Sequence, residues 1–398
     1  MNKLDEILYD SLKVEELPDQ NLNRQIFEKW SKEEKTMKQK RKLHFQSYAA
    51  KVAVVLVLVA LTAGTVTVGA IYLHKWSKSL GEGLISSKEK QKQLEEGGYA
   101  DFKGITQTVN GVTISLEQSL ADDNFGYIAF KVKGAENKEG MIPQFSNTVV
   151  QVEGTEPDWS GKFYNNIVVN KGGSISYSDG SKVEYDANDT AKGRYMDKDG
   201  NLEYTVMIRM NDSLEEKFVP SKNKLIGKKI HMELSDLSYG NEKGEIQTVK
   251  KGTWVFDWTL KGKAESVEKQ ADQKVGSSAV TITNVKMTPL SVSITGKLDM
   301  NRYKEAKDGM WDKDNATLPA FYGVKYRNGT IVYIGTMDSW QRGFDEDGLY
   351  HEFTGISSDM IDVGEVVSLI YIDGPLQETT RKGYVAPAKD QFVEVKLK

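Results

Sequence analysis

The sequence contains no cysteine and only four histidines among its 398 residues. Without cysteine, the chain can form no disulfide and no zinc site of the usual Cys/His type. His44 and His74 flank an apolar run, whereas His231 and His351 are far apart in the sequence. We therefore predict neither a metal centre nor a bound cofactor, and we expect any folded body to depend on its hydrophobic core.

The sequence also lacks the motifs Gly-x-Ser-x-Gly, His-Glu-x-x-His and Gly-x-x-x-x-Gly-Lys-Ser/Thr. The most metal-like string is Asp197–Glu203, whose acidic residues alternate as in a calcium-binding loop. Gly200 stands at the fourth position of that string instead of the sixth, and Ile208 stands at the twelfth, where such a loop has glutamate. We interpret the string as a hairpin turn and predict that the chain is not an enzyme. A pair of glycosidase carboxylates stays open as an alternative, because sequence does not reveal their separation.

Charge is absent from the run Val52–Leu73, which is apolar throughout apart from scattered threonine, glycine and tyrosine. As a helix this run reaches about 33 Å, enough to cross a hydrocarbon core of about 30 Å. The basic block from Lys35 to Lys51 contains no acidic residue, which places the N-terminus in the cytoplasm and the rest of the chain outside. We predict a single transmembrane helix, with a buried core helix or core strand as the alternative.

Residues 1–51 are predicted to form a short cytoplasmic stub of two amphipathic helices. In the second helix, Leu22, Ile26, Phe27 and Trp30 share one apolar face. Helices this short are marginal alone, so the stripe indicates a protein partner. The alternative is a tail that lies on the anionic lipid surface. The net charge of the chain, −4, gives no sign of direct nucleic-acid binding.

Residues 74–98 are rich in Ser, Gly, Lys and Glu, and we predict a linker with one short helix at Lys88–Glu96. From Tyr99 onward the apolar residues alternate, as in half-buried strands. Asn110–Gly111 and Asn328–Gly329 are strong hairpin signals. Trp254, Phe256, Trp258 and Leu260 fall on one face of a strand, where we expect core, with an aromatic ligand platform as the alternative.

Short strands at regular spacing predict a mainly β body of two immunoglobulin-like sandwiches. We place the first extracytoplasmic domain at residues 99–265 and the second at residues 266–398, because residues 262–275 are polar and charged. A cysteine-free outer body fits the surface of a Gram-positive bacterium better than a eukaryotic secretory route.

The layout resembles the domain of unknown function 4179 family. The resemblance rests on a Leu-Pro-x-x-Leu-Asn-like helix start at Leu17–Asn23, on one span, and on the strands Gln107–Glu117, Gly252–Trp258 and Val280–Ser291. It implies a single-pass protein of Gram-positive bacteria, often encoded beside an extracytoplasmic-function sigma factor and acting as a membrane-anchored anti-sigma factor. The chain lacks the His-x-x-x-Cys-x-x-Cys motif of zinc-containing anti-sigma domains.

We therefore expect a regulator whose stub holds a sigma factor at the membrane and whose outer sandwiches sense an envelope ligand or stress, with release by a protease near the span. The alternative is a surface protein whose sandwiches bind wall polymer or a partner protein, with the stub only as an anchor.

Overall fold

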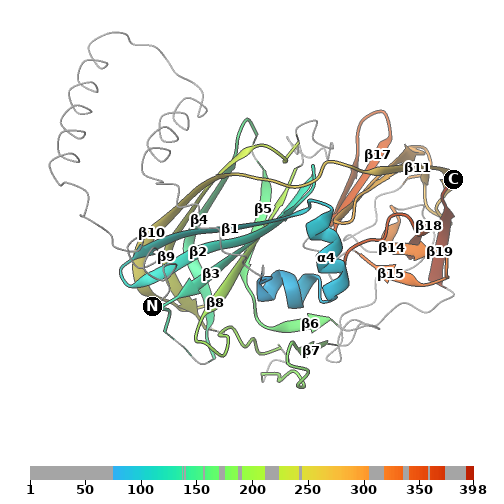
Figure 1. Ribbon diagram of the computed structural model, residues 1–398. Coiled ribbons are helices and arrows are strands. Elements are labelled where there is room, and N and C mark those ends of the chain that lie inside the picture. Colours follow the sequence, from blue (N-terminus) through green and yellow to red (C-terminus); the bar gives the residue numbers. More distant parts are fainter. Residues whose placement is uncertain are drawn as a thin grey trace, which may run out of the picture. The chain divides into compact units, whose positions relative to one another are not determined.

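The computed structural model describes residues 75–398 apart from 137, 139, 156, 170–174, 187–190, 211–223, 242–243, 304–317, 335–339, 357–358 and 373–390. The predicted stub and the predicted span lie outside the described residues. Within the described part, no helix combines the length and the hydrophobicity that crossing a bilayer requires. The predicted mainly β architecture is confirmed, because nearly all described elements are strands (Figure 1).

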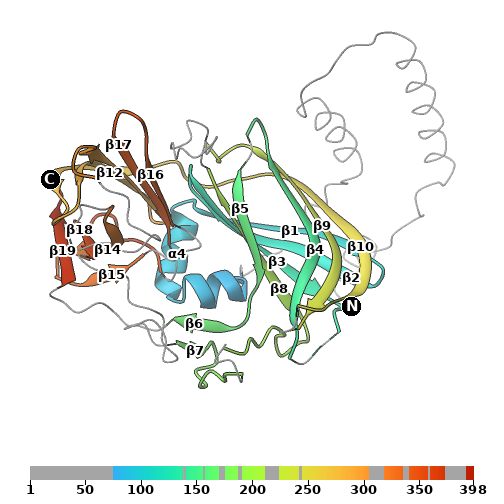
Figure 2. The ribbon, with the colours of Figure 1, turned by 180° about the vertical axis from the view of Figure 1, so that it is seen from behind.

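The first sandwich pairs a five-stranded sheet with a three-stranded sheet (Figure 2). The larger sheet has the order β1 (Ala100–Val109), β2 (Val112–Ala121), β3 (Phe125–Lys133), β8 (Leu202–Arg209) and β5 (Asp158–Phe163). The smaller sheet has the order β10 (Ile246–Thr259), β9 (Lys229–Gly240) and β4 (Ile142–Val152). A separate hairpin joins β6 (Ile167–Val169) to β7 (Ile175–Tyr177).

Turn chemistry sets the register of the first hairpin. Asn110 and Gly111 have φ values of 49° and 81°, as a two-residue type I′ turn requires, so Val109 pairs with Val112. The metal-like string is also a turn, because the Asp197 carboxylate accepts hydrogen bonds from the backbone N–H groups of Asp199 and Asn201, both at 2.8 Å. The string Asp197–Glu203 is therefore a turn that leads into β8 (Leu202–Arg209), but it does not connect a hairpin, because β8 pairs with β3 and β5.

Alternating side chains from both sheets build the core of the first sandwich. Trp254, Phe256 and Leu260 are fully buried and Trp258 is 6 % exposed, so the prediction that this face forms core is confirmed. The Trp254 indole donates a hydrogen bond to the carbonyl oxygen of Val112 at 3.1 Å, which ties the two sheets together. Burial of such aromatic groups supplies a large share of the hydrophobic stabilisation.

The second sandwich also has two sheets. The larger has the order β11 (Val267–Lys274), β12 (Val280–Met287), β13 (Ser291–Leu298), β17 (Leu349–Gly355) and β16 (Trp340–Phe344). The smaller has the order β15 (Ile331–Tyr333), β14 (Ala320–Tyr326), β18 (Val366–Ile372) and β19 (Phe392–Lys396). The strands change from one sandwich to the other between Thr259 and Val267, where the sequence predicts a domain boundary.

The two sandwiches share one strand order. In the first, β2-β3-β8-β5 faces β4-β9-β10; in the second, β12-β13-β17-β16 faces β14-β18-β19. Each larger sheet has one additional N-terminal edge strand, β1 or β11, and the second sandwich adds β15. The strand starts Val112-Thr-Ile-Ser and Val280-Thr-Ile-Thr, which are weakly similar in sequence, therefore occupy equivalent places.

The structure corrects the prediction of a linker at residues 74–98. Described residues 75–98 contain the π-helix η1 (Ser79–Leu84) and the α-helix α4 (Lys88–Glu96), the latter at the predicted residues. Five apolar side chains from this segment are buried: Trp76, Leu80, Leu84, Ile85 and Leu94. Polar composition hides them, because only these few large apolar groups are spread among Ser, Gly, Lys and Glu.

Candidate functional site

Residues 75–98, here called the exit segment, join the predicted span to β1 and are built into the folded body. In η1, the Ile85 N–H donates to the Leu80 carbonyl at 2.8 Å, which is the i to i+5 bond of a π-helix. The α4 helix begins after Ser87, whose hydroxyl accepts from the Lys90 N–H at 3.5 Å, and it ends at Gly97. The start of α4 therefore has a local sequence cause, whereas η1 has no side-chain cap.

Two side chains of the first sandwich, the half-buried Glu203 and the fully buried Gln118, hold the beginning of η1. The Glu203 carboxylate on β8 accepts hydrogen bonds from the backbone N–H groups of Lys78 at 2.8 Å and Ser79 at 2.7 Å. The Gln118 amide oxygen on β2 accepts from the Ser77 N–H at 3.1 Å. Burial raises the pKa of Glu203, and the hydrogen bonds from Ser79 and Lys78 partly offset that rise. These side chains satisfy N–H groups that a helix start leaves unpaired.

The two helices of the exit segment are also joined to each other. The Gln91 amide of α4 donates to the carbonyl oxygens of Gly81 at 2.9 Å and Ile85 at 2.7 Å. The Trp76 indole donates to the Glu95 carboxylate. A Cβ atom at Gly81 would lie 2.8 Å from the Trp76 Cβ, so glycine permits this close packing.

The exit segment shares a hydrophobic core with both sandwiches. Its buried leucines belong to one cluster with Phe125 and Tyr127 of β3 and with Phe353 and Ile356 of the second sandwich. An ion pair between Lys90 on α4 and Asp359 adds a polar contact to the second sandwich. Both ribbon views show the blue helices between the strands of the two sandwiches (Figures 1 and 2).

A fully buried carboxylate joins the two sandwiches directly. Asp122, in the turn between β2 and β3, accepts from the hydroxyls of Thr288 at 2.5 Å and Ser291 at 2.6 Å. It also accepts from the N–H groups of Asn124 at 2.8 Å and Phe125 at 2.7 Å. Burial raises the pKa of Asp122, and these four donors oppose the rise.

Aromatic contacts surround this carboxylate. The rings of Phe125 and Phe353 have centroids 4.3 Å apart, and the Tyr127 hydroxyl donates to the Ile356 carbonyl at 3.0 Å. Thr288 and Ser291 belong to the turn between β12 and β13, which is equivalent to the turn that holds Asp122. The two sandwiches thus meet through matching turns, and the buried contacts make the junction specific.

Tyr99 connects the exit segment to the irregular segment that joins β10 of the first sandwich to β11 of the second. Its N–H donates to Leu94 at 2.9 Å, its carbonyl accepts from Ala121 at 3.0 Å, and its hydroxyl donates to the Glu265 carbonyl at 3.2 Å. Burial raises the pKa of Tyr99 to about 12. Through its backbone and its side chain, Tyr99 therefore links the end of α4, the end of β2 and the connection to the second sandwich.

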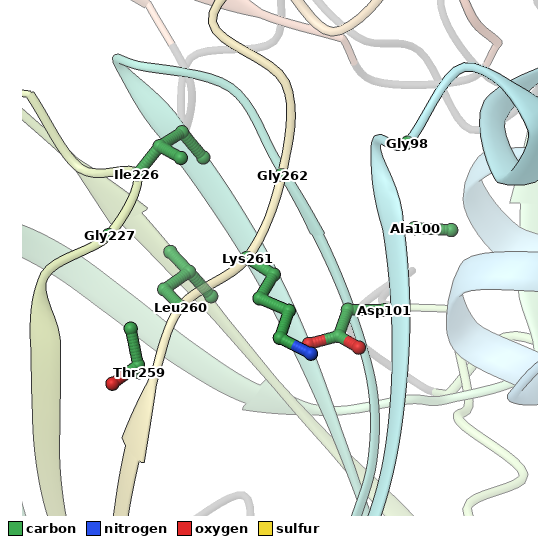
Figure 3. A pocket seen from close by; sticks show the side chains of 9 residues that line it. All are labelled: Gly98, Ala100, Asp101, Ile226, Gly227, Thr259, Leu260, Lys261 and Gly262. Carbon is green, nitrogen blue, oxygen red and sulfur yellow. The ribbon is translucent and has the colours of Figure 1, made fainter.

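A cleft of about 420 Å³ lies beside this connection (Figure 3). Its lining includes the apolar side chains of Ile226 and Leu260 and the charged side chains of Asp101 and Lys261. Asp101 forms an ion pair with Lys103. The cleft is open to solvent, and four of its nine lining residues are glycine or alanine.

His231 lies on the outer face of the β4-β9-β10 sheet. Its ring nitrogens are 2.8 Å from Asp257 and 3.1 Å from Glu233. Burial lowers the pKa of His231, but hydrogen bonds and charge from the two carboxylates outweigh it, so the pKa is raised. Among the described residues, no group of three or more His, Cys, Asp or Glu side chains could hold a metal ion.

The sequence-predicted partner residues, Leu22, Ile26, Phe27 and Trp30, lie outside the described residues. Sequence reasoning missed Glu203, Gln118 and Asp122. The signal for Gln118 was present, because it interrupts an apolar alternation on β2. A register shift between Leu116 and Gln118 turns the following side chains to the other face, toward the exit segment.

Residues 40–134 match the family described as Domain of unknown function (DUF4179), which confirms the predicted resemblance. No curated protein matches the chain. Among solved structures, the chain is similar to the one titled "The crystal structure of the conserved domain protein from Bacillus anthracis", at 15% identity and a TM-score of 0.38, covering 70% of this chain and 78% of that chain. A likeness of this degree carries no argument about function.

Proposed function

On the premise that residues 40–134 belong to the DUF4179 family, we propose that this chain is a membrane-anchored, anti-sigma-factor-like regulator. The segment 52–73 would cross the membrane once, with residues 1–51 in the cytoplasm and the sandwiches outside. The stub would hold an extracytoplasmic-function sigma factor through Leu22, Ile26, Phe27 and Trp30. The outer body would receive an envelope signal, such as a ligand or a protease.

The packing of the exit segment supports the proposal that a signal passes from the outer body to the membrane. A protein that only needs an anchor works with a flexible Gly/Ser-rich tether, whose slack absorbs any movement of the body. Here the first described residues after the predicted span are hydrogen-bonded to Gln118 and Glu203 and share a core with both sandwiches. A rearrangement of the sandwiches would therefore move the chain close to the outer membrane surface.

A co-purification experiment tests the stub. The full-length protein, extracted in mild detergent, should retain a sigma factor, and Trp30→Ala should abolish the recovery because it removes the largest apolar group of the stripe. Lys32→Ala, outside the stripe, is the matched control and should retain it. Failure to recover any sigma factor with the unaltered protein would contradict the proposal.

A surface-binding role is the second candidate. We infer an immunoglobulin-like arrangement for both sandwiches, because their strand orders follow A-B-E-D against C-F-G. Tandem domains of this kind often bind partners at cell surfaces, here a wall polymer or a protein. If the chain is a surface-binding protein, deletion of residues 1–34 should leave its function intact. If it is a regulator, the same deletion should abolish its control of the sigma factor.

A further inference from the structure

The interface between η1 and the first sandwich and the junction between the two sandwiches belong to one hydrophobic cluster but hold different polar contacts. The junction combines aromatic packing with a carboxylate that has four donors. The η1 interface combines the buried apolar side chains of Leu80, Leu84 and Ile85 with two polar side chains, the buried Gln118 and the half-buried Glu203. Gln118 and Glu203 accept hydrogen bonds from backbone N–H groups at the start of η1. Contacts of η1 with β3 and β8 place it over the outer face of the larger sheet.

This face carries two buried polar atoms that have no hydrogen-bond partner among the described residues. Gln118 and Thr205 pair with Ala129 from either side and so fall in one row of the sheet. The Gln118 amide nitrogen and the Thr205 hydroxyl have no hydrogen-bond partner in the part of the chain that the structure describes. Burial of an unpaired polar group costs free energy that water would restore on opening.

The backbone of η1 is also unfavourable. A π-helix is rare and is often found at functional sites. Its sequence, Ser-Leu-Gly-Glu-Gly-Leu, includes two glycines, which lose the most conformational entropy on folding. The segment is therefore fixed by outside contacts more than by its own helix propensity.

From these observations we propose that Ser77–Ile85, here called the strap, is a releasable element. It detaches from the outer face of β3 and β8 while the two sandwiches stay joined at Asp122. Release hydrates Gln118, Thr205 and Glu203 and lengthens the chain between the membrane and the body. The inference deepens the proposed function, on which its regulatory meaning rests, but the detachment itself does not depend on a sigma factor.

Hydrogen exchange on the full-length protein in detergent micelles tests the strap. Peptides covering residues 77–85 should exchange at least tenfold faster than peptides of β3 and β13, because they open without global unfolding. Glu203→Gln removes the charge that holds two N–H groups and should speed strap exchange at least fivefold, with β3 and β13 unchanged. Glu184→Gln, in an exposed ion pair with Arg194, is the matched control and should change nothing.

A second variant should slow hydrogen exchange of the strap, whereas Glu203→Gln should speed it. Thr205→Val replaces the unpaired hydroxyl with a methyl group of similar size, so it should slow strap exchange about threefold or more. The proposal would be overturned if the strap exchanged at the same rate as β3. It would also be overturned if Glu203→Gln raised the exchange rate uniformly throughout the protein. Neither result depends on recovery of a sigma factor. The strap proposal and the proposed function can therefore fail independently, and the two experiments tell these failures apart.

Discussion

At the scale of single residues, Asp122 carries the junction between the sandwiches. Asp122→Ala would leave the hydroxyls of Thr288 and Ser291 and two backbone N–H groups without their acceptor. We expect a loss of about 3 kcal/mol in the free energy of unfolding, measured by urea denaturation. Asp199→Ala, at an exposed turn, should change it by about 0.5 kcal/mol or less. Equal effects of the two variants would contradict the role of Asp122.

His231 makes the stability of the folded protein depend on pH, and the sign of this dependence follows from its pKa shift. Its pKa is raised in the folded state by Asp257 and Glu233, against the opposing effect of burial. A raised pKa adds stability that is fully present below about pH 6.5 and is lost as the pH rises through the folded-state pKa. The unaltered protein should therefore lose more stability than His231→Gln between pH 6 and 8.5 in urea denaturation. Parallel pH profiles of the two proteins would contradict this assignment.

At the scale of elements, the β1–β2 hairpin depends on its turn. Gly111 has φ 81°, where a side chain is strained, so Gly111→Ala should cost about 1 kcal/mol in the free energy of unfolding. Gly364→Ala is the matched control, since a Cβ at Gly364 would lie no closer than 3.7 Å to another group. If both alanine variants unfold at the same urea concentration, the turn does not set the register.

The elements also show what sequence pattern can and cannot predict. Asn110–Gly111 and the Trp254–Leu260 alternation are local signals, and the structure has both features as predicted. The shift after Leu116 leaves one local sign, the polar Gln118 at an otherwise apolar position of β2, but the pattern alone does not show that this side chain reaches the exit segment. A π-helix has no simple periodic signature, so tertiary contacts decide its place.

At the scale of the molecule, the equivalent strand orders explain why Val112 and Val280 begin similar strands. The sequence similarity between the halves is too weak to establish this equivalence alone. The contact between the sandwiches joins residues as far apart as Asp122 and Thr288, and no local pattern predicts it. The partner stripe on the stub stays a prediction.

The central claim is that the exit segment lies outside the membrane and is built into the body. Because the chain has no cysteine, single-cysteine variants can be labelled in intact cells with a membrane-impermeant maleimide. Lys92→Cys, at an exposed position on α4, should label rapidly from outside, whereas Leu94→Cys, fully buried, should label only after denaturation. Labelling of Lys92→Cys only after the membrane is permeabilised, or equally fast labelling at both positions, would contradict the account.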